Sequence, residues 1–190
     1  MIAAFLALAL AQSPAQDAVA AVSDLASPDP AARARGACTL RDGGTVAAPA
    51  IPKLALLLGD GSPVEESVCG EHNWRAVGHA DRLTTPGEQA AATLLAIGSA
   101  AYDVFAGALR SPSWIARQNA AWGLGALRDP RASALLRPLL QDSEPPVRAM
   151  TAWALGVLRD RDSLTPLVAA LNDADPRVRR QAAWALGVIR

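Results

Sequence analysis

Ala121-Trp122-Gly123-Leu124-Gly125 is the first of three nearly identical phrases in this sequence. The phrase returns as Ala152-Trp153-Ala154-Leu155-Gly156 and as Ala183-Trp184-Ala185-Leu186-Gly187, so that the three tryptophans are 31 residues apart. A fixed period of this length is typical of a solenoid of stacked two-helix units, because each unit buries its apolar face only against its neighbours. The spacing therefore predicts an all-α chain folded as an α-solenoid, an α-α superhelix.

The composition agrees with a helical chain and gives no sign of a charged partner. The 190 residues carry 18 basic and 18 acidic side chains and are rich in alanine and leucine, which are strong helix formers. Because the charges balance, nothing electrostatic favours nucleic acid or an anionic membrane as the partner. The chain also lacks a glycine-rich phosphate loop after a strand, a strand pattern and a Gly-x-Ser-x-Gly elbow. We therefore expect no enzyme activity and no cofactor.

The repeats predict about five helical hairpins within residues 16–190, with one insertion in the second. Asp175 is a natural N-cap for the last helix, and Pro176 fits its first turn. Thr85, Pro86 and Glu88 form a capping box that predicts a helix running to about residue 97. The predicted units are 16–41, 48–98 with the insertion at 62–84, 99–128, 131–159 and 162–190.

The pattern Asp-x-x-Val-Arg-x-x-Ala-Ala-x-Ala-Leu-Gly resembles the HEAT-like repeats named after phycobilisome lyases. The resemblance covers about residues 17–190 and is most specific in the last three units. It implies a ladder between units, formed by an aspartate at the end of each first helix and an arginine six residues later. Asp142 with Arg148 and Asp173 with Arg179 have this spacing. Arg117 and Arg33 keep the arginine but follow serines, and we expect the ladder to break at the insertion.

The helical wheel places the tryptophans away from the core. At 100° per residue, Val178, Ala185, Leu186 and Ile189 lie within about 60° of Ala182, whereas Trp184 lies about 200° away. The resemblance implies that the second helices line the concave face of the array. The tryptophans would then form a line along a groove that could hold an extended peptide. The alternative is that each indole fills the seam between adjacent repeats. The candidate binding residues are Trp122, Trp153, Trp184, Met150, Gln118, Arg177, Arg180 and Gln181.

The insertion gathers the few reactive side chains. His72 and His79 lie in it with Glu71, Trp74 and Asp81, but their spacing matches no closed zinc pattern, so we expect no metal site. Cys69 lies there too, and Cys38 lies one unit earlier. A disulfide between them would attach the insertion to the first repeat if the protein is exported, since exported proteins meet an oxidising compartment. The alternative is two buried free thiols.

The first 15 residues predict export. Met1–Ala11 is an apolar run that resembles a signal peptide with an Ala9-Leu10-Ala11 cleavage site, although the basic residues that usually precede such a run are missing. The run is too short to span a bilayer. The alternative is an apolar helix packed on the first repeat. We therefore expect a periplasmic or secreted protein, with a cytoplasmic location as the alternative.

These features favour a non-enzymatic scaffold that binds a protein or an extended peptide along the concave face. A second reading is a lyase-like or chaperone-like handler of a small ligand or metal, acting through the Cys- and His-bearing insertion. A third is DNA binding along a concave face, which the cluster Arg177, Arg179 and Arg180 supports only locally. No polar cap is evident on the last repeat, so we also expect a homodimer or a longer array to cover that end.

Overall fold

The computed structural model describes residues 14–65, 67–69 and 83–189, and for residues 14–16 it describes only the backbone. The predicted all-α solenoid is confirmed. In the described part of the chain the helices form five hairpins, each with a first helix and a longer second helix that packs on it. The hairpins are α1 (Pro14–Asp24) with α2 (Pro30–Asp42); η1 (Gly44–Ala50) and α3 (Ile51–Leu57) with α4 (Pro86–Ile97); η3 (Ser99–Ala101) and α5 (Tyr102–Ala108) with α6 (Trp114–Leu127); α7 (Ala132–Leu136) and η4 (Arg137–Gln141) with α8 (Pro145–Leu158); and η5 (Arg161–Ser163) and α9 (Leu164–Ala170) with α10 (Pro176–Val188).

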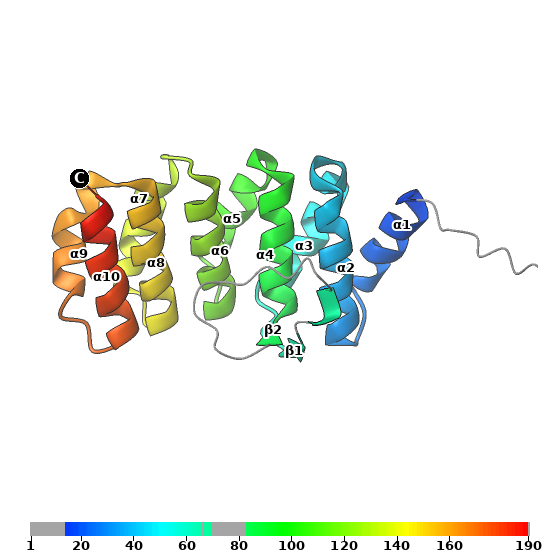
Figure 1. Cartoon of the computed structure of the whole chain (residues 1–190), viewed down its shortest axis with the longest axis horizontal. Coiled ribbons are helices and arrows are strands. Elements are labelled where there is room, and N and C mark those ends of the chain that lie inside the picture. Colours follow the sequence, from blue (N-terminus) through cyan, green and yellow to red (C-terminus); the bar gives the residue numbers. More distant parts are fainter. Residues whose placement is uncertain (1–13, 66, 70–82, 190) are drawn as a thin grey trace, which may run out of the picture.

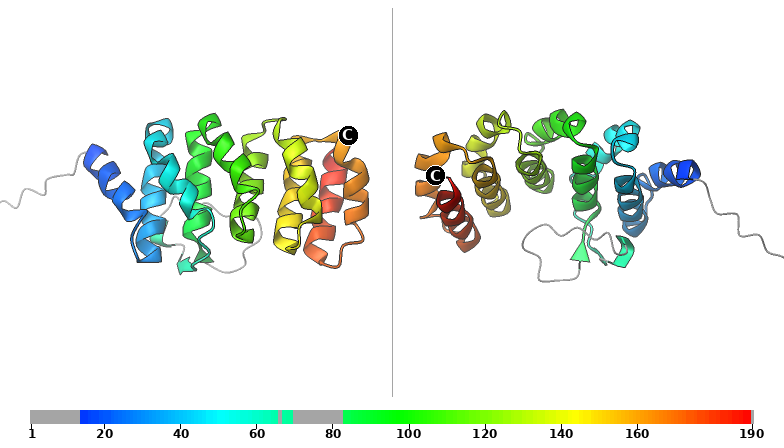
Figure 2. Two further views of the ribbon diagram at one scale, coloured as in Figure 1. Left: turned by 180° about the vertical axis from the view of Figure 1, so that it is seen from behind. Right: turned by 45° about the horizontal axis from the view of Figure 1, so that its top comes forward.

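The hairpins stack side by side into two rows. The second helices α2, α4, α6, α8 and α10 form one row, and the first helices form the other behind it (Figure 1). Successive second helices pack directly on each other, α4 on α2, α6 on α4, α8 on α6 and α10 on α8. The array bends into a shallow arch with the second helices on its inner side (Figure 2, right). The second helices therefore form one continuous layer on the inner side of the arch.

Local sequence signals set where the second helices begin. Asp29 and Asp175 accept hydrogen bonds from backbone N–H groups of the first turns of α2 and α10, and proline follows each. Thr85 accepts from the Glu88 N–H at the start of α4, as the capping box predicts. The ends of α6 and α8 are reached at Arg128 and Arg159, which adopt the left-handed conformation with φ 55° and 54°.

The core is a layer of small and aliphatic side chains between the two rows. Val178, Ala182 and Ala185 of α10 are fully buried, as the wheel predicts for its apolar stripe. The larger core residues come from both rows and include Leu54, Leu94, Phe105, Leu124, Leu136, Leu155 and Leu167. Alanines on the second helices let neighbouring backbones approach closely, and this close stacking gives the array its continuity.

The inserted segment begins and ends with a short antiparallel pair that the sequence did not indicate. Strand β1 (Val64–Glu65) pairs with β2 (Leu83–Thr84), with Val64 opposite Thr84. A two-residue strand is too short to show an alternating pattern, which explains why the pair was not predicted. Both strands lie beside the second-helix row (Figure 2).

Candidate functional site

The second helices of the last three hairpins form the surface that the tryptophan phrase marks. α6, α8 and α10 run in the same direction, so equivalent positions form lines across the row (Figure 1). Gln118, Ala149 and Arg180 make one such line at intervals of 31 residues, and all three are at least partly exposed. The repeat thus brings candidate residues from separate hairpins onto one face.

The three tryptophans differ in their exposure along this row. Trp122 is 4% exposed and Trp184 is 41% exposed, while Trp153 is half-buried against the core. The wheel prediction is therefore wrong for Trp122, which belongs to the packing and is unavailable as a wall of a groove. The wheel places a side chain only relative to its own helix, whereas burial also depends on what the rest of the fold places over that helix. Of the three phrase tryptophans, Trp153 and Trp184 keep exposed indole surface.

Each of the last two indoles lies against a glycine of the preceding hairpin. A Cβ on Gly156 would lie 2.7 Å from Cζ3 of Trp184, and a Cβ on Gly125 would lie 3.0 Å from Cζ3 of Trp153. The same added Cβ atoms would lie 2.9 Å from the Cα atoms of Ala185 and Ala154, respectively. Tryptophan and glycine of the repeated phrase are therefore partners across successive repeats. The indoles fill the seam, and part of Trp184 remains exposed.

A second set of equivalent positions consists of Asn119, Met150 and Gln181, and its members differ in burial. Asn119 donates a hydrogen bond from its side-chain amide to the carbonyl of Leu58, 2.9 Å away in the second hairpin. Met150 is 31 residues further on and only 8% exposed, so it too is a packing residue and not the surface residue that we predicted. Gln181, the third member, is partly exposed.

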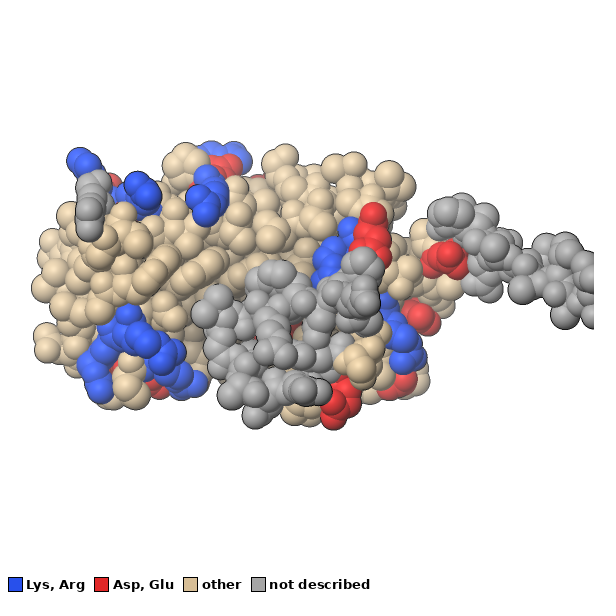
Figure 3. All heavy atoms as spheres, in the orientation of Figure 1, with Lys and Arg blue, Asp and Glu red and all other residues tan. Residues whose placement is uncertain are grey.

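Basic side chains lie at both ends of the second-helix face in Figure 3. The surface over α8 and α10 is largely uncharged, and basic side chains gather at its lower end in Figure 3. Arg177, Arg179 and Arg180 at the start of α10 are all exposed. Arg177 forms an ion pair with Asp175 at 2.7 Å, and this hydrogen bond lowers the pKa of Asp175 to about 2. The carboxylate of the N-cap Asp175 therefore neutralises one of these three positive charges, that of Arg177.

The ladder arginines connect successive hairpins. Arg117 donates to both carboxylate oxygens of Asp142 at 2.7 and 2.8 Å, and Arg148 does the same to Asp173. Arg33 donates to Asp60 at 2.7 Å. In each pair the aspartate ends the first helix of the hairpin that follows the arginine. Asp142 and Arg148, which are six residues apart, therefore do not pair with each other. They belong to two successive ion pairs, Arg117–Asp142 and Arg148–Asp173.

The same arginines also hold the loop of their own hairpin. Nη1 of Arg148 donates to the carbonyls of Asp142 and Ser143, at 2.8 and 3.2 Å. The hydrogen bond from Arg148 lowers the pKa of Asp173 although burial opposes the shift. Burial acts more strongly on Asp142, yet the bonds from Arg117 and the Glu144 N–H still leave its pKa lowered. Each ladder step is a charge-assisted contact in a partly buried place.

Cys38 and Cys69 form a disulfide between the first hairpin and the inserted segment. Cys38 lies in α2 at the position that tryptophan occupies in the last three second helices. The bridge closes a sequence separation of 31 residues, and both cysteines are buried. It attaches one end of the inserted segment to the second-helix row.

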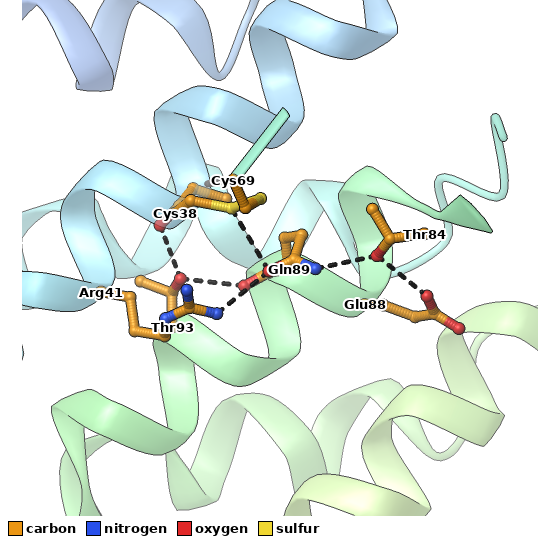
Figure 4. Close-up of a disulfide and its surroundings, with 8 residues drawn as sticks. Cys38, Arg41, Cys69, Thr84, Glu88, Gln89 and Thr93 are labelled. Carbon is orange, nitrogen blue, oxygen red and sulfur yellow. Dashed lines mark hydrogen bonds between the residues drawn. A yellow bond between two sulfur atoms is a disulfide. The ribbon is translucent and has the colours of Figure 1, made fainter. Parts of the chain in front are cut away.

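A buried polar cluster beside the disulfide holds the other end of the inserted segment (Figure 4). The fully buried Gln89 donates to the Thr84 hydroxyl at 2.8 Å and accepts from Arg41 at 3.1 Å. Thr84 in turn donates to the Glu88 carboxylate. Thr93 donates to the carbonyl of Ala37 at 2.7 Å, which links α4 to α2. Sequence reasoning missed this cluster, although Gln89 and Thr93 stand four residues apart within an apolar helix and so share one face.

The histidines and most acidic residues of the insertion lie outside the described residues. This applies to Glu71, His72, Trp74, His79 and Asp81. Within the described ranges, no group of three or more His, Cys, Asp or Glu side chains is placed to hold a metal ion. Among the helices of those ranges, none has the length and apolar character needed to cross a membrane.

Two surface hollows lie away from the tryptophans. One of about 710 Å³ runs between α3 and α5 on the first-helix side, where its lining includes Leu56 and Val104. The other, of about 370 Å³, lies beside Asp142, Arg148 and Asp173 of the ladder. Neither hollow is lined by a residue of the candidate binding set.

Comparison with known proteins places the repeats in a family. A family model for HEAT repeats matches residues 87–146 and 133–190, which together exceed half of the chain. No curated protein matches the chain at a significant level.

Solved structures with the same architecture are similar in fold. A chain from the complex of CpcE and CpcF of phycocyanin lyase from Nostoc sp. PCC7120 has a TM-score of 0.62 and 22% identity, covering 100% of this chain and 70% of that one. Importin beta gives a TM-score of 0.65 at 18% identity, covering 92% of this chain and 25% of its own. A designed armadillo-repeat protein in complex with the peptide (KR)4 gives 0.52 at 22% identity, covering 87% and 78%. At these identities the likeness concerns the fold alone.

Proposed function

Since this chain belongs to the family of HEAT-repeat proteins, we propose that it is a non-enzymatic scaffold that binds a protein or an extended peptide along the inner row of second helices. The observation that carries the proposal is the surface of α8 and α10. It is largely uncharged, and on it Trp184 keeps 41% of its surface exposed next to the half-buried Trp153. Partly exposed tryptophans on a rigid surface are typical anchors of protein interfaces.

The charges on this face suggest the chemistry of the partner. Arg180 is exposed at the basic end, and within the described residues it has no carboxylate partner. Gln118 and Gln181 add uncharged hydrogen-bonding groups to the same row. An extended segment with apolar side chains and an acidic group near Arg180 would match this arrangement. Two of the similar structures support a peptide or protein partner, because one was solved with the peptide (KR)4 and another is itself a complex of two proteins.

A cross-linking experiment tests which face is used. A photo-reactive amino acid is placed at position 149 or 180 on the second-helix row, and at the control positions 56 or 134 on the first-helix row, in the full chain within its native host. We expect one protein to be captured from positions 149 and 180 and not from the controls. Equal capture from both rows would contradict the proposal.

A pair of charge substitutions then tests the binding energy. Arg180→Glu should weaken binding of the captured protein at least about tenfold, because it places a carboxylate where the partner presents its own. Ala134→Glu is the matched control on an exposed first-helix position and should leave binding unchanged. Trp184→Ala is avoided as the main test, since that indole also packs on Gly156 and its loss would disturb the fold. Unchanged affinity of Arg180→Glu, with the fold intact by circular dichroism, would refute the proposed surface.

The alternative function, handling of a small ligand by the insertion, has one supporting observation. The chain shares its fold with a chain of a phycocyanin lyase complex. A coloured or metal-containing molecule that remains with the purified protein would favour this alternative over a scaffold. We expect the ultraviolet–visible spectrum of the purified protein to show only the aromatic absorbance of the chain.

We further propose that the protein works outside the cytoplasm, in the periplasm or the secreted fraction. The Cys38–Cys69 disulfide supports this location, because such bonds persist in oxidising compartments. Cell fractionation followed by alkylation of the protein without reductant is the test. Recovery from the cytoplasm with two alkylated thiols would contradict the proposal.

A further inference from the structure

The contacts that join neighbouring hairpins differ from one seam to the next. Arginine–aspartate pairs of the ladder cross the seam between the first and second hairpins, the seam between the third and fourth, and the seam between the fourth and fifth. Within the described residues, no ion pair joins the second hairpin to the third. The ladder is therefore interrupted in the middle of the array.

Both partners of the ladder are replaced at this seam. In α2, α6, α8 and α10 the ladder arginine is the fourth residue after the N-cap. The N-cap of α4 is Thr85, so its ladder position is Gln89, whose buried side chain accepts a hydrogen bond from Arg41 of the first hairpin. The position of the ladder aspartate in the third hairpin is Ser111, which carries no charge. The seam thus lacks the cation and the anion together.

The glycine of the tryptophan seam is also replaced here. Gly125 and Gly156 are the twelfth residues after the N-caps of α6 and α8, and the tryptophan of the following hairpin lies against each. The twelfth residue after the N-cap of α4 is the buried Ile97. Its branched side chain fills the space that glycine leaves open for an indole.

One tight polar contact remains at this seam beside the packing of α6 on α4. Asn119 of α6 donates to the carbonyl of Leu58 at 2.9 Å. Next to it, a Cβ on Gly59 would lie 3.1 Å from the hydroxyl oxygen of Ser113. The backbone at the end of α3 therefore lies directly against the first turns of α6.

A hollow opens on the outer side of the same seam. It measures about 710 Å³ and lies between α3 and α5, whereas the hollow at the last ladder step measures about 370 Å³. A Cβ on Gly107, which lines the larger hollow, would meet no described atom within 4 Å. A tight contact beside an open space is the arrangement of a hinge, because α3 and α5 have room to approach each other.

From these observations we propose that the seam between the second and third hairpins is a hinge built into the array. Hairpins one and two form one rigid body, joined by their ladder pair and by the bond from Thr93 to the carbonyl of Ala37. Hairpins three to five form the other, joined by two ladder steps. Because the second helices line the inner side of the arch, an approach of α3 and α5 on the outer side flattens the arch (Figure 2). The motion shifts the first two hairpins relative to the surface of α8 and α10.

Distance measurements between pairs of spin labels on the full chain test the hinge. Nitroxide labels are introduced through a non-natural amino acid, which leaves the Cys38–Cys69 bond untouched. The labels occupy four exposed, equivalent positions on the first-helix side of the last four hairpins: 52, 103, 134 and 165. We expect the distance distribution of the pair 52–103 to be at least about twice as wide as those of 103–134 and 134–165. Equal widths at the three seams would overturn the proposal.

A matched pair of substitutions in the hollow tests its role. Gly107→Trp fills the hollow and keeps α3 and α5 apart, so it should narrow the 52–103 distribution about twofold. The 103–134 distribution, which shares one label, should stay unchanged. Gly107→Ala favours helix but leaves the hollow almost empty, and it should keep the width of the parent chain. Equal narrowing by alanine and tryptophan, or none by tryptophan, would contradict a hinge that closes into this hollow.

Discussion

At the scale of single residues, the ladder arginines illustrate how one side chain connects two repeats. Arg148 binds the loop carbonyls of its own hairpin and the carboxylate of Asp173 in the next, and the side chains of both residues are largely buried. Neither group is hydrated well enough to stand alone, so each depends on the other for its stability. The neighbouring core residue Thr151 is an exception to this pairing, because its buried hydroxyl has no hydrogen-bond partner among the described residues.

Loss of a ladder carboxylate should destabilise the protein and weaken its response to acid. Asp173→Asn is expected to cost about 1–3 kcal/mol near neutral pH, because it leaves Arg148 without its anion. The pKa of Asp173 in the folded protein is below its ordinary value of 3.8. Its contribution to stability is therefore complete above pH 3.8 and is lost as the pH falls through the lowered pKa.

Thermal melts between pH 6 and pH 2 measure this effect. The parent chain should lose stability below about pH 4, and Asp173→Asn should lose less over the same range. Asp103→Asn, on an exposed residue of α5, is the control and should behave like the parent. A variant with the acid dependence of the parent would show that the ladder carboxylate does not contribute in this window.

Removing the unpaired hydroxyl of Thr151 should stabilise the protein. The equivalent positions in the adjacent second helices are Ala120 and Ala182, so the repeat itself requires no polar group there. Thr151→Val keeps the volume and is expected to raise the free energy of unfolding by about 1 kcal/mol, measured by urea denaturation. A loss of stability would mean that the hydroxyl is satisfied in solution, for example by a bound water.

At the scale of helices, the seam between second helices combines a tryptophan and a glycine that are distant in sequence. Trp184 fits against Gly156 because glycine has no Cβ, and the same contact joins Trp153 to Gly125. The repeated phrase thus supplies both partners of this packing contact, the glycine from one hairpin and the tryptophan from the next. Close helix packing of this kind leaves no space for an additional methyl group.

Two matched glycine substitutions should separate packing from helix propensity. Gly156→Ala is expected to destabilise the protein by about 1–3 kcal/mol, because its methyl group would overlap Trp184 and Ala185. Gly187→Ala meets no described atom and should be neutral or stabilising by up to about 1 kcal/mol, because alanine favours helix. Denaturant unfolding of both variants is the measurement. Equal effects at the two positions would refute the seam contact.

The disulfide links an element of the insertion to α2 and should contribute strongly to stability. A crosslink closing about 30 residues is expected to stabilise by about 2–4 kcal/mol, and the separation here is 31. Cys69→Ser should lower the melting temperature, and reductant should lower that of the parent to a similar extent. If reductant has no effect on the parent, the bond is absent or contributes nothing.

At the scale of the whole molecule, stability in a solenoid comes from contacts between neighbours. Within the described residues, the first and last hairpins each have a neighbouring hairpin on one side only. Such proteins behave nearly as one-dimensional systems, in which terminal units open more readily than central ones.

Hydrogen exchange should therefore show a gradient of protection along the chain. We expect the slowest exchange in α4, α6 and α8, which have second-helix neighbours on both sides, and faster exchange in α1 and α10. Mass spectrometry of peptides from the intact, oxidised protein is the measurement. Uniform protection from α1 to α10 would indicate a single cooperative unit instead of a repeat array.

The sequence by itself determined the repeat and most of its helix boundaries. The 31-residue period, the caps at Thr85 and Asp175 and the apolar stripe of Val178, Ala182 and Ala185 all depend on local spacing, so a single chain reveals them. The arginine of each ladder step could also be named, because its spacing within a repeat is constant.

Only the tertiary structure decided which surfaces stay open. A helical wheel describes one helix, whereas the burial of Trp122 and Met150 depends on the other parts of the fold that cover them. The same holds for Arg148, whose carboxylate partner Asp173 is 25 residues away, and for the cluster around Gln89, which joins two hairpins across the insertion. Contacts between repeats form only when the repeats stack, and for that reason the different exposure of Trp122, Trp153 and Trp184 could be learned only from the folded array.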